Sequence, residues 1–173
     1  MGGVGVEQLW APWRLAYVAH PDRPRPTAPA DACFLCRAAR GDGSTDRADY
    51  VVGRTPHSVV VLNRFPYNNG HLLVSPLAHT ADLADLAPDE TLDLQATIAR
   101  LIAVLRRRLN AEGFNVGLNL GAVAGAGLPG HLHWHVVPRW AGDTNFMPVL
   151  ADATVIVQSL DSLWDLLRGE LAP

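Results

Sequence analysis

The stretch HLHWHVVPRW, residues 131–140, carries a histidine at every second position of its first half. In a β-strand the side chains alternate between two faces, so His131, His133 and His135 would share one face. The apolar side chains between them would point to the opposite face. A helix would scatter the three rings around its circumference. The spacing therefore predicts a strand that presents a row of imidazoles.

A row of three imidazoles admits three interpretations: a histidine-rich surface strand, a catalytic metal site, or a row that faces a phosphate chain. Three histidines on a straight strand rarely converge on one ion, whereas side chains about 6.5–7 Å apart can serve one extended ligand. The glycine-rich GAVAGAG, residues 121–127, favours the third interpretation because its backbone N–H groups can bind anionic oxygens. Asn119, Gly125 and Gly127 are therefore candidate substrate-binding residues. A neutral imidazole is a good nucleophile at phosphorus because it needs no deprotonation.

The chain has two cysteines, Cys33 and Cys36, in the sequence CFLC. Such a pair can be a redox couple, half of a zinc site, or without a role. A redox motif of this kind usually follows a strand, but here the pair follows the proline-rich stretch PDRPRPTAPADA. A zinc site would need two further ligands from elsewhere in the chain.

The composition excludes several classes of function. The 173 residues have a formal net charge of −3, which gives no electrostatic case for a nucleic acid polymer as partner. There is no lysine, so neither a Walker-type phosphate loop nor a Schiff-base enzyme is possible. No apolar run has transmembrane length, and MGGVGVEQLW lacks the features of a signal peptide. We expect a cytoplasmic protein with no membrane partner.

The pattern of strands and helices predicts an α+β fold, an antiparallel β-meander with helices on one face. The longest helix is expected from Pro88 to Asn110, with Leu94, Ile98, Leu101, Ile102, Leu105 and Leu109 as its buried stripe. We expect residues 1–30 to be an extension with a proline-rich linker and residues 31–173 to be the domain. The other expected elements are strands at residues 50–55, 58–65, 70–79, 114–121, 131–138 and 154–157, and a helix at 159–171 capped by Ser159.

The stretches HLHWHVVPRW and VVVLNRFPYNNGHLLVSP resemble the histidine triad (HIT) superfamily, whose signature is His-x-His-x-His followed by two apolar residues. The resemblance extends from about Cys33 to Asn145. It implies a homodimer of α+β subunits that forms a nucleotidyl-histidine intermediate on the α-phosphorus of a nucleotide. The implied catalytic residues are His133 as nucleophile, His135 as a phosphate contact and His131, whose carbonyl or ring orients His133. The implied substrate-binding residues include Asn119 at the phosphate and Asn63 at the ribose.

The same resemblance implies a structural zinc ion held by two cysteines and two histidines. Carried onto this sequence, the ligands are Cys33, Cys36, His79 and His131, which form a closed set suited to structure rather than catalysis. His71, in the turn NNGHLL, matches no ligand position and is expected to be structural.

The sequence departs from the family just before the triad. Hydrolytic members usually have Gly-Gln-Ser or Gly-Gln-Thr there, and the hydroxyl is thought to protonate the leaving group. This chain has GAGLPG, with Gly127 and Leu128 in that region. A polyphosphate leaving group needs less help of this kind, in particular when Mg²⁺ neutralises its oxygens.

The flanking stretches LWAPWR and PRWAGDTNF resemble a bacterial branch that includes diadenosine tetraphosphate phosphorylases. The leading hypothesis is therefore a nucleotidyl hydrolase or transferase that cleaves dinucleoside polyphosphates, with water or phosphate as acceptor. The alternative enzyme is a nucleoside phosphoramidate or nucleoside monophosphate-ester hydrolase. A nucleotide-binding regulatory dimer is the alternative without catalysis.

Overall fold

The computed structural model describes residues 29–143 and 156–171. Within them lies one five-stranded sheet in which every pair of neighbours is antiparallel, in the order β1-β2-β3-β5-β4. The strands are β1 (Val51–Arg54), β2 (Ser58–Leu62), β3 (Leu72–Pro76), β4 (Gly113–Leu118) and β5 (Trp134–Arg139). The helices are η1 (Ala30–Ala32), α2 (Phe34–Arg40), α3 (Asp46–Asp49), η2 (Leu83–Asp85), α4 (Pro88–Leu109), η3 (Ala122–Ala124) and α6 (Leu160–Leu167). The α+β fold class is confirmed.

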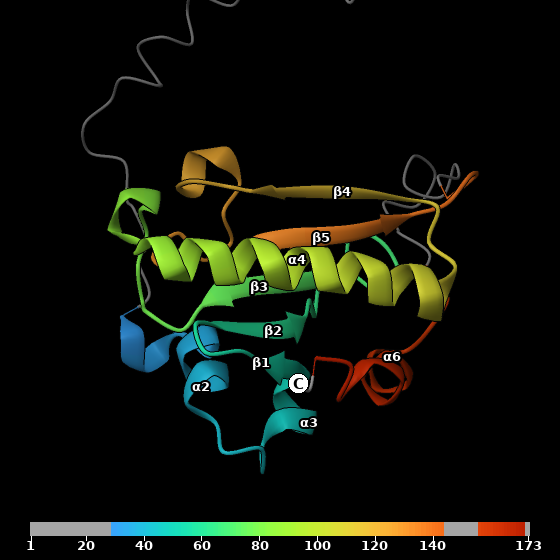
Figure 1. Ribbon diagram of the computed structural model, residues 1–173, viewed down its shortest axis with the longest axis horizontal. Helices are drawn as coiled ribbons and strands as arrows, with labels where there is room; N and C mark the ends of the chain where they lie inside the picture. The colour runs from blue at the N-terminus through green and yellow to red at the C-terminus, as the bar shows by residue number, and fades with distance from the viewer. Residues whose placement is uncertain (1–28, 144–155, 172–173) are drawn as a thin grey trace, which may run out of the picture.

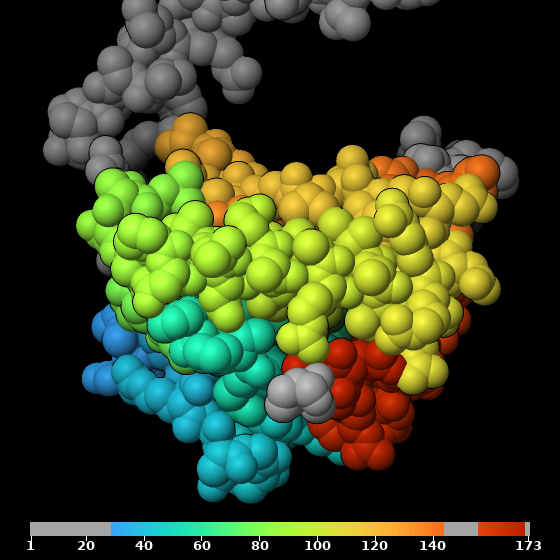
Figure 2. Space-filling model, viewed as in Figure 1, coloured from blue at the N-terminus to red at the C-terminus, as the bar shows by residue number. Residues whose placement is uncertain are grey.

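Helix α4 runs across one face of the sheet (Figure 1), and its side chains cover that face in the space-filling view (Figure 2). It begins at Pro88, where the side chain of Glu90 accepts a hydrogen bond from the amide of Ala87. It ends before Asn110, whose left-handed backbone (φ 52°) terminates the helix. Of the predicted stripe, Leu94, Ile98, Leu101 and Leu105 are buried, while Ile102 and Leu109 are partly buried.

The two faces of the sheet carry separate apolar clusters because strand side chains alternate. Val60, Leu72 and Val74 face α4 and α6, whereas Val59, Val61 and Leu73 face the opposite side together with Cys33 and Cys36. Helix α2 packs on this second face, where no helix was expected from the sequence. A strand buried on both faces has no polar alternation, which explains the uninterrupted SVVVL of β2.

The histidine stretch keeps its predicted alternation although the strand begins later than expected. Leu132 and Trp134 lie in the cluster beneath α4, and His131 and His133 lie on the other side. Strand β5 itself starts only at Trp134. Before that point the amide of Leu132 donates to the carbonyl of Thr80 (2.7 Å), and its carbonyl accepts from Ser75 Oγ (2.7 Å). The segment before β5 is therefore held by the backbone of Thr80 and by a side chain of β3 rather than by ladder hydrogen bonds.

The C-terminal elements agree only in part with expectation. Of the strand predicted at 154–157, the first two residues lie outside the described residues, and Ile156 and Val157 are not in a strand. Helix α6 is capped by Ser159, whose Oγ accepts from the amide of Ser162 (3.2 Å), but it ends at Leu167. The predicted extension at 1–30 lies almost wholly outside the described residues. No helix in the described part is long and apolar enough to cross a membrane.

Replacing Leu101 with Ala should lower the free energy of unfolding by about 2–5 kcal/mol, because its side chain is buried between α4 and the sheet. The matched control is Leu92→Ala in the same helix, where the leucine is 71% exposed and the change should stay within about 0.5 kcal/mol. Urea denaturation of both variants measures the difference. Equal effects would contradict the assignment of the buried face.

Candidate active site

A pocket of about 480 Å³ opens beside the histidine stretch on the face of the sheet opposite α4. His133 and His135 line one side of it, and His133 is only 5% exposed. Further lining residues come from α2, α3, β2 and the segment after it, β3 and the glycine-rich region; they are Phe34, Arg37, Asp49, Leu62, Asn63, Arg64, Phe65, Tyr67, Leu73, Gly125, Gly127 and Leu128. The pocket thus combines imidazoles with aromatic walls and loop backbone.

The ring of His133 is held by the backbone of its neighbour. Its Nδ1 lies 2.8 Å from the carbonyl oxygen of His131. A carbonyl oxygen can only accept, so Nδ1 must carry a proton and donate it. In the neutral ring the lone pair is then on Nε2. Of the two orienting groups considered for His131, the carbonyl is the one that contacts the ring of His133.

The proton of His135 is placed by a second chain of hydrogen bonds, which passes through His71. The amide of Tyr67 donates to Nδ1 of His71 (3.1 Å), so the proton of the neutral His71 ring is on Nε2. That Nε2 donates to Nδ1 of His135 (2.9 Å), which leaves the proton of His135 on its own Nε2. Nε2 of His135 is buried and has no hydrogen-bond partner within the described chain. A buried N–H without a partner is costly, and an anionic oxygen in the pocket would satisfy it.

Burial keeps these rings neutral. Burial, together with charge repulsion from the neighbouring His135 and His133, lowers the pKa of His71 to about 3. Burial, followed by the charge of His133, also lowers the pKa of His135. At neutral pH both rings therefore exist in the tautomers that the hydrogen bonds select.

The predicted substrate-binding residues are only partly brought together. Asn63, Gly125 and Gly127 line the pocket, and Gly125 has a left-handed backbone (φ 94°) that favours glycine. Asn119 is not among the residues that line the pocket, but its Nδ2 lies near Gly125, 3.8 Å from the position that a Cβ on Gly125 would take. Nδ2 of Asn63 forms a hydrogen bond with Nδ1 of His71 (3.3 Å), and Oδ1 of Asn63 accepts one from the amide of Phe65 (2.9 Å).

Cys33, Cys36, His79 and His131 meet at one point beside the pocket, with all four ligand atoms within 4.8 Å of one another. Nδ1 of His131 lies 3.3 Å from the sulfur of Cys33, and Nδ1 of His79 lies 3.1 Å from that of Cys36. A tetrahedral zinc ion would separate such atoms by about 3.3–3.8 Å, given its bond lengths to sulfur and nitrogen. The residues therefore fit a zinc ion.

The surroundings of the cluster suit metal ligation. Nε2 of His131 donates to the carbonyl of Pro76 (2.9 Å), which turns the lone pair of Nδ1 toward the sulfurs. Burial lowers the pKa of His131 to about 4, so the ring is neutral. Without a cation, burial raises the pKa of the Cys36 thiol to about 11, and a bound zinc ion would reverse this preference.

The HIT domain family matches residues 44–142. AP-4-A phosphorylase of Mycobacterium tuberculosis is 39% identical over 175 residues, which cover 98% of this chain and 89% of that protein. This chain belongs to the HIT family. The match confirms the resemblance drawn from the sequence and the expectation of an enzyme.

Other relatives agree with this membership. Bis(5'-nucleosyl)-tetraphosphatase [asymmetrical] of Schizosaccharomyces pombe is 34% identical over 90 residues, 52% of this chain and 49% of that protein. Among solved structures, a Zn-bound histidine triad family protein from Mycobacterium smegmatis superposes with a TM-score of 0.65 at 28% identity, covering 83% of this chain and 96% of that one.

His71 is the residue of the site that sequence reasoning missed. It lies immediately before β3, and β3 pairs with β5 so that Leu73 stands opposite His135. The contact depends on this pairing between distant segments. The one available signal was a histidine directly before a strand of a HIT-like sheet.

The free energy of unfolding should decrease as the pH drops below about 6.5. In that range His71 binds a proton in the unfolded chain but stays neutral in the folded protein. The contribution is fully present above pH 6.5 and is lost at about 1.4 kcal/mol per pH unit for this ring as the pH falls toward 3. Denaturant unfolding of the wild type and of His71→Gln at pH 7 and pH 5 measures it. The variant should show the shallower dependence, and His57→Gln, at a partly exposed surface histidine, should match the wild type. Equal slopes for His71→Gln and wild type would contradict the buried neutral ring.

Proposed function

We propose that this HIT protein transfers the nucleotidyl group of a dinucleoside polyphosphate, such as diadenosine tetraphosphate, through a covalent histidine intermediate. Nε2 of His133 attacks the α-phosphorus, a P–N bond forms, and the bond between phosphorus and the bridging oxygen of the polyphosphate breaks. The N–H of His135 binds the phosphoryl oxygens. The observation that carries this proposal is the pairing of a free Nε2 lone pair on His133 with an unsatisfied N–H on His135.

The glycine-rich loop supports a polyphosphate as leaving group. Where it lines the pocket it contributes Gly125, Gly127 and Leu128, and none of these side chains can donate a proton. An amine that leaves phosphorus must first be protonated, whereas a di- or triphosphate departs as an anion. Mg²⁺ bound to the substrate would neutralise the departing oxygens further.

The same argument favours phosphate as the acceptor in the second step. Phosphate is already anionic near pH 7 and needs little base assistance, whereas water needs a base. Attack of a phosphate oxygen on the nucleotidyl-histidine forms a new P–O bond, breaks the P–N bond and yields a nucleoside diphosphate. The similarity to AP-4-A phosphorylase over nearly the whole chain supports this acceptor.

Diadenosine tetraphosphate should be cleaved at least about ten times faster than adenosine phosphoramidate, a difference of about 1.4 kcal/mol in barrier. Added phosphate should shift the adenylyl product from AMP to ADP. Chromatography of the products with and without phosphate measures both effects. A faster reaction with the phosphoramidate, with AMP as sole product at every phosphate concentration, would favour the phosphoramidate hydrolase. Nucleotide binding without turnover would favour the regulatory dimer.

The control that ties turnover to this site is His133→Ala, which should lower the rate by several orders of magnitude because the covalent nucleophile is lost. His57→Ala is the matched change outside the pocket and should leave the rate unaltered. A rate for His133→Ala above one tenth of the wild-type rate would show that another group is the nucleophile.

We propose further that Cys33, Cys36, His79 and His131 bind a structural zinc ion. The set supplies four ligand atoms, as a closed tetrahedral site requires. The bound ion would fix the ring of His131, whose carbonyl in turn orients His133. It has no place in the chemical step, because its ligands lie beside the pocket and are not among the residues that line it.

Metal analysis of freshly purified protein should give about one zinc per chain. The double change Cys33→Ser and Cys36→Ser should abolish zinc retention and lower the melting temperature by at least about 5 °C, because metal binding contributes to the free energy of folding. The control is Ser44→Ala, an exposed position between α2 and α3. Protein that stays free of zinc, with a melting temperature unaffected by chelation, would exclude this role.

We also propose that the chain forms a homodimer through β4. This strand is at the edge of the sheet and pairs only with β5 among the described elements, so its outer backbone groups can pair with a second copy. Its side chains include the exposed Val116, which a partner would cover. The molar mass from light scattering tests this assembly.

A further inference from the structure

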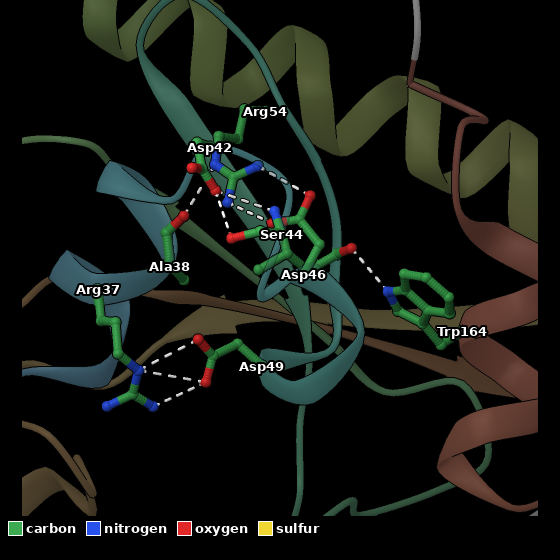
Figure 3. Close-up of polar contacts among 9 residues, drawn as sticks. Arg37, Ala38, Asp42, Ser44, Asp46, Asp49, Arg54 and Trp164 are labelled. Atoms are coloured by element: carbon green, nitrogen blue, oxygen red, sulfur yellow. Dashed lines mark hydrogen bonds and ion pairs between the residues drawn. The ribbon is translucent and has the colours of Figure 1, made fainter.

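Helix α3 carries two carboxylates that pair with arginines on neighbouring elements (Figure 3). Asp46 binds Arg54 of β1 through two hydrogen bonds of 3.0 and 2.6 Å. Asp49 binds Arg37 of α2 at 3.1 Å from Nε and 2.8 Å from Nη2. Only the second pair lines the pocket that holds His133 and His135.

The two pairs differ in what else they do. Nε of Arg54 also donates to the carbonyl of Ala38, so the Arg54–Asp46 pair ties α2, α3 and β1 together. The side chain of Arg37 is 59% exposed, whereas that of Asp49 is 11% exposed. An exposed arginine in an ion pair adds little to stability. Arg37 is nevertheless held in one orientation, with part of its guanidinium still open to the pocket.

The position of the Arg37–Asp49 pair within the pocket suits contact with the nucleoside part of a bound nucleotide. Asp49 also lies 3.9 Å from Arg64, the residue after Asn63. Arg37 is one helical turn after Phe34, so the two side chains share a face of α2. Phe34 and Phe65 provide aromatic surface in the same pocket. Flat apolar walls with a polar pair at the rim are the features that bind a stacked base and read its edge.

We infer that Arg37 and Asp49 read the edge of the nucleobase and select a 6-aminopurine over a 6-oxopurine. The inference rests on the proposed function, since it concerns the base of the nucleotide that His133 would attack. The hydrogen-bond donor is the guanidinium of Arg37, and the acceptor is the carboxylate of Asp49. Together they present a donor beside an acceptor.

Adenine matches this arrangement along its N7 edge, because the exocyclic amine donates and N7 accepts. A 6-oxopurine replaces the amine with an oxygen, which would then face the carboxylate with like partial charge. Asp49 is firmly anionic, because the hydrogen bonds from Arg37 hold the pKa of its carboxyl group below the usual range. An arginine alone would instead favour the two acceptors of a 6-oxopurine. The carboxylate of Asp49 is therefore what changes the preference from a 6-oxopurine to a 6-aminopurine.

The test compares diadenosine tetraphosphate with diinosine tetraphosphate, which differ at the position that Asp49 is expected to contact. The wild type should prefer the adenine substrate at least about tenfold in kcat/KM. Asp49→Asn, which supplies both a donor and an acceptor, should reduce the preference to within about threefold. Arg37→Met should also reduce the preference for the adenine substrate. Because this change affects an exposed side chain, the variant can replace Asp49→Asn in the test if Asp49→Asn folds poorly.

The matched controls are Asp46→Asn and Arg54→Met, which break the other ion pair of the same helix. They should lower stability and leave the base preference at the wild-type ratio. Calorimetric titration with AMP and IMP gives the same comparison without turnover. A preference for AMP that Asp49→Asn abolishes supports the inference even if no dinucleotide is cleaved, which would overturn only the proposed function. A wild-type ratio near one, an unchanged ratio in Asp49→Asn, or no binding of either nucleotide would overturn the inference.

Discussion

The hydrogen bond from Nδ1 of His133 to the carbonyl of His131 is the contact on which the rest of the site depends. It selects the tautomer that leaves Nε2 of His133 with a lone pair, and it uses the backbone of a residue whose ring belongs to the Cys-His cluster. One residue therefore serves two centres, the ring for the cluster and the carbonyl for the nucleophile. The sharing is possible because the ring and the carbonyl of His131 point to different neighbours, the ring to Cys33 and the carbonyl to His133.

The face of the sheet away from α4 carries the chemistry, and the face beneath α4 carries most of the core. Large apolar side chains from β2, β3, β5, α4 and α6 fill the first space, where close packing contributes most of the stability. The second face holds a smaller cluster with the cysteines, which leaves room for the pocket. Buried imidazoles are tolerated there because each ring nitrogen that lacks solvent has a partner, apart from Nε2 of His135. The exception lies where a substrate oxygen would bind.

Local patterns in the sequence predicted the five strands of the sheet, the span of α4 and the alternation of the histidine stretch, but they also predicted a strand at 154–157, where Ile156 and Val157 are not in a strand. Periodicity and capping are properties of neighbouring residues, as with Pro88 in the first turn of α4 and Ser159 at the cap of α6. The four candidate metal ligands followed from the family resemblance, and the structure brings them together. The role of His71 and the packing of α2 were missed, since both depend on which distant segments pair. Asn119, expected at the phosphate from the family resemblance, is not among the residues that line the pocket, and its Nδ2 would lie 3.8 Å from a Cβ on Gly125.

Helix α3 shows how a very short element can hold a functional side chain in place. Four residues make a single turn, which is not stable on its own because helix nucleation is costly. Its position is fixed from outside by the Arg54–Asp46 pair and by the indole of Trp164, which donates to the carbonyl of Val51 just beyond the helix (2.8 Å) (Figure 3). Because these contacts fix the position of α3, its Asp49 can bind Arg37 beside the pocket. On this single turn, the Arg54–Asp46 pair thus stabilises the segment, and the Arg37–Asp49 pair provides the base selectivity that we infer.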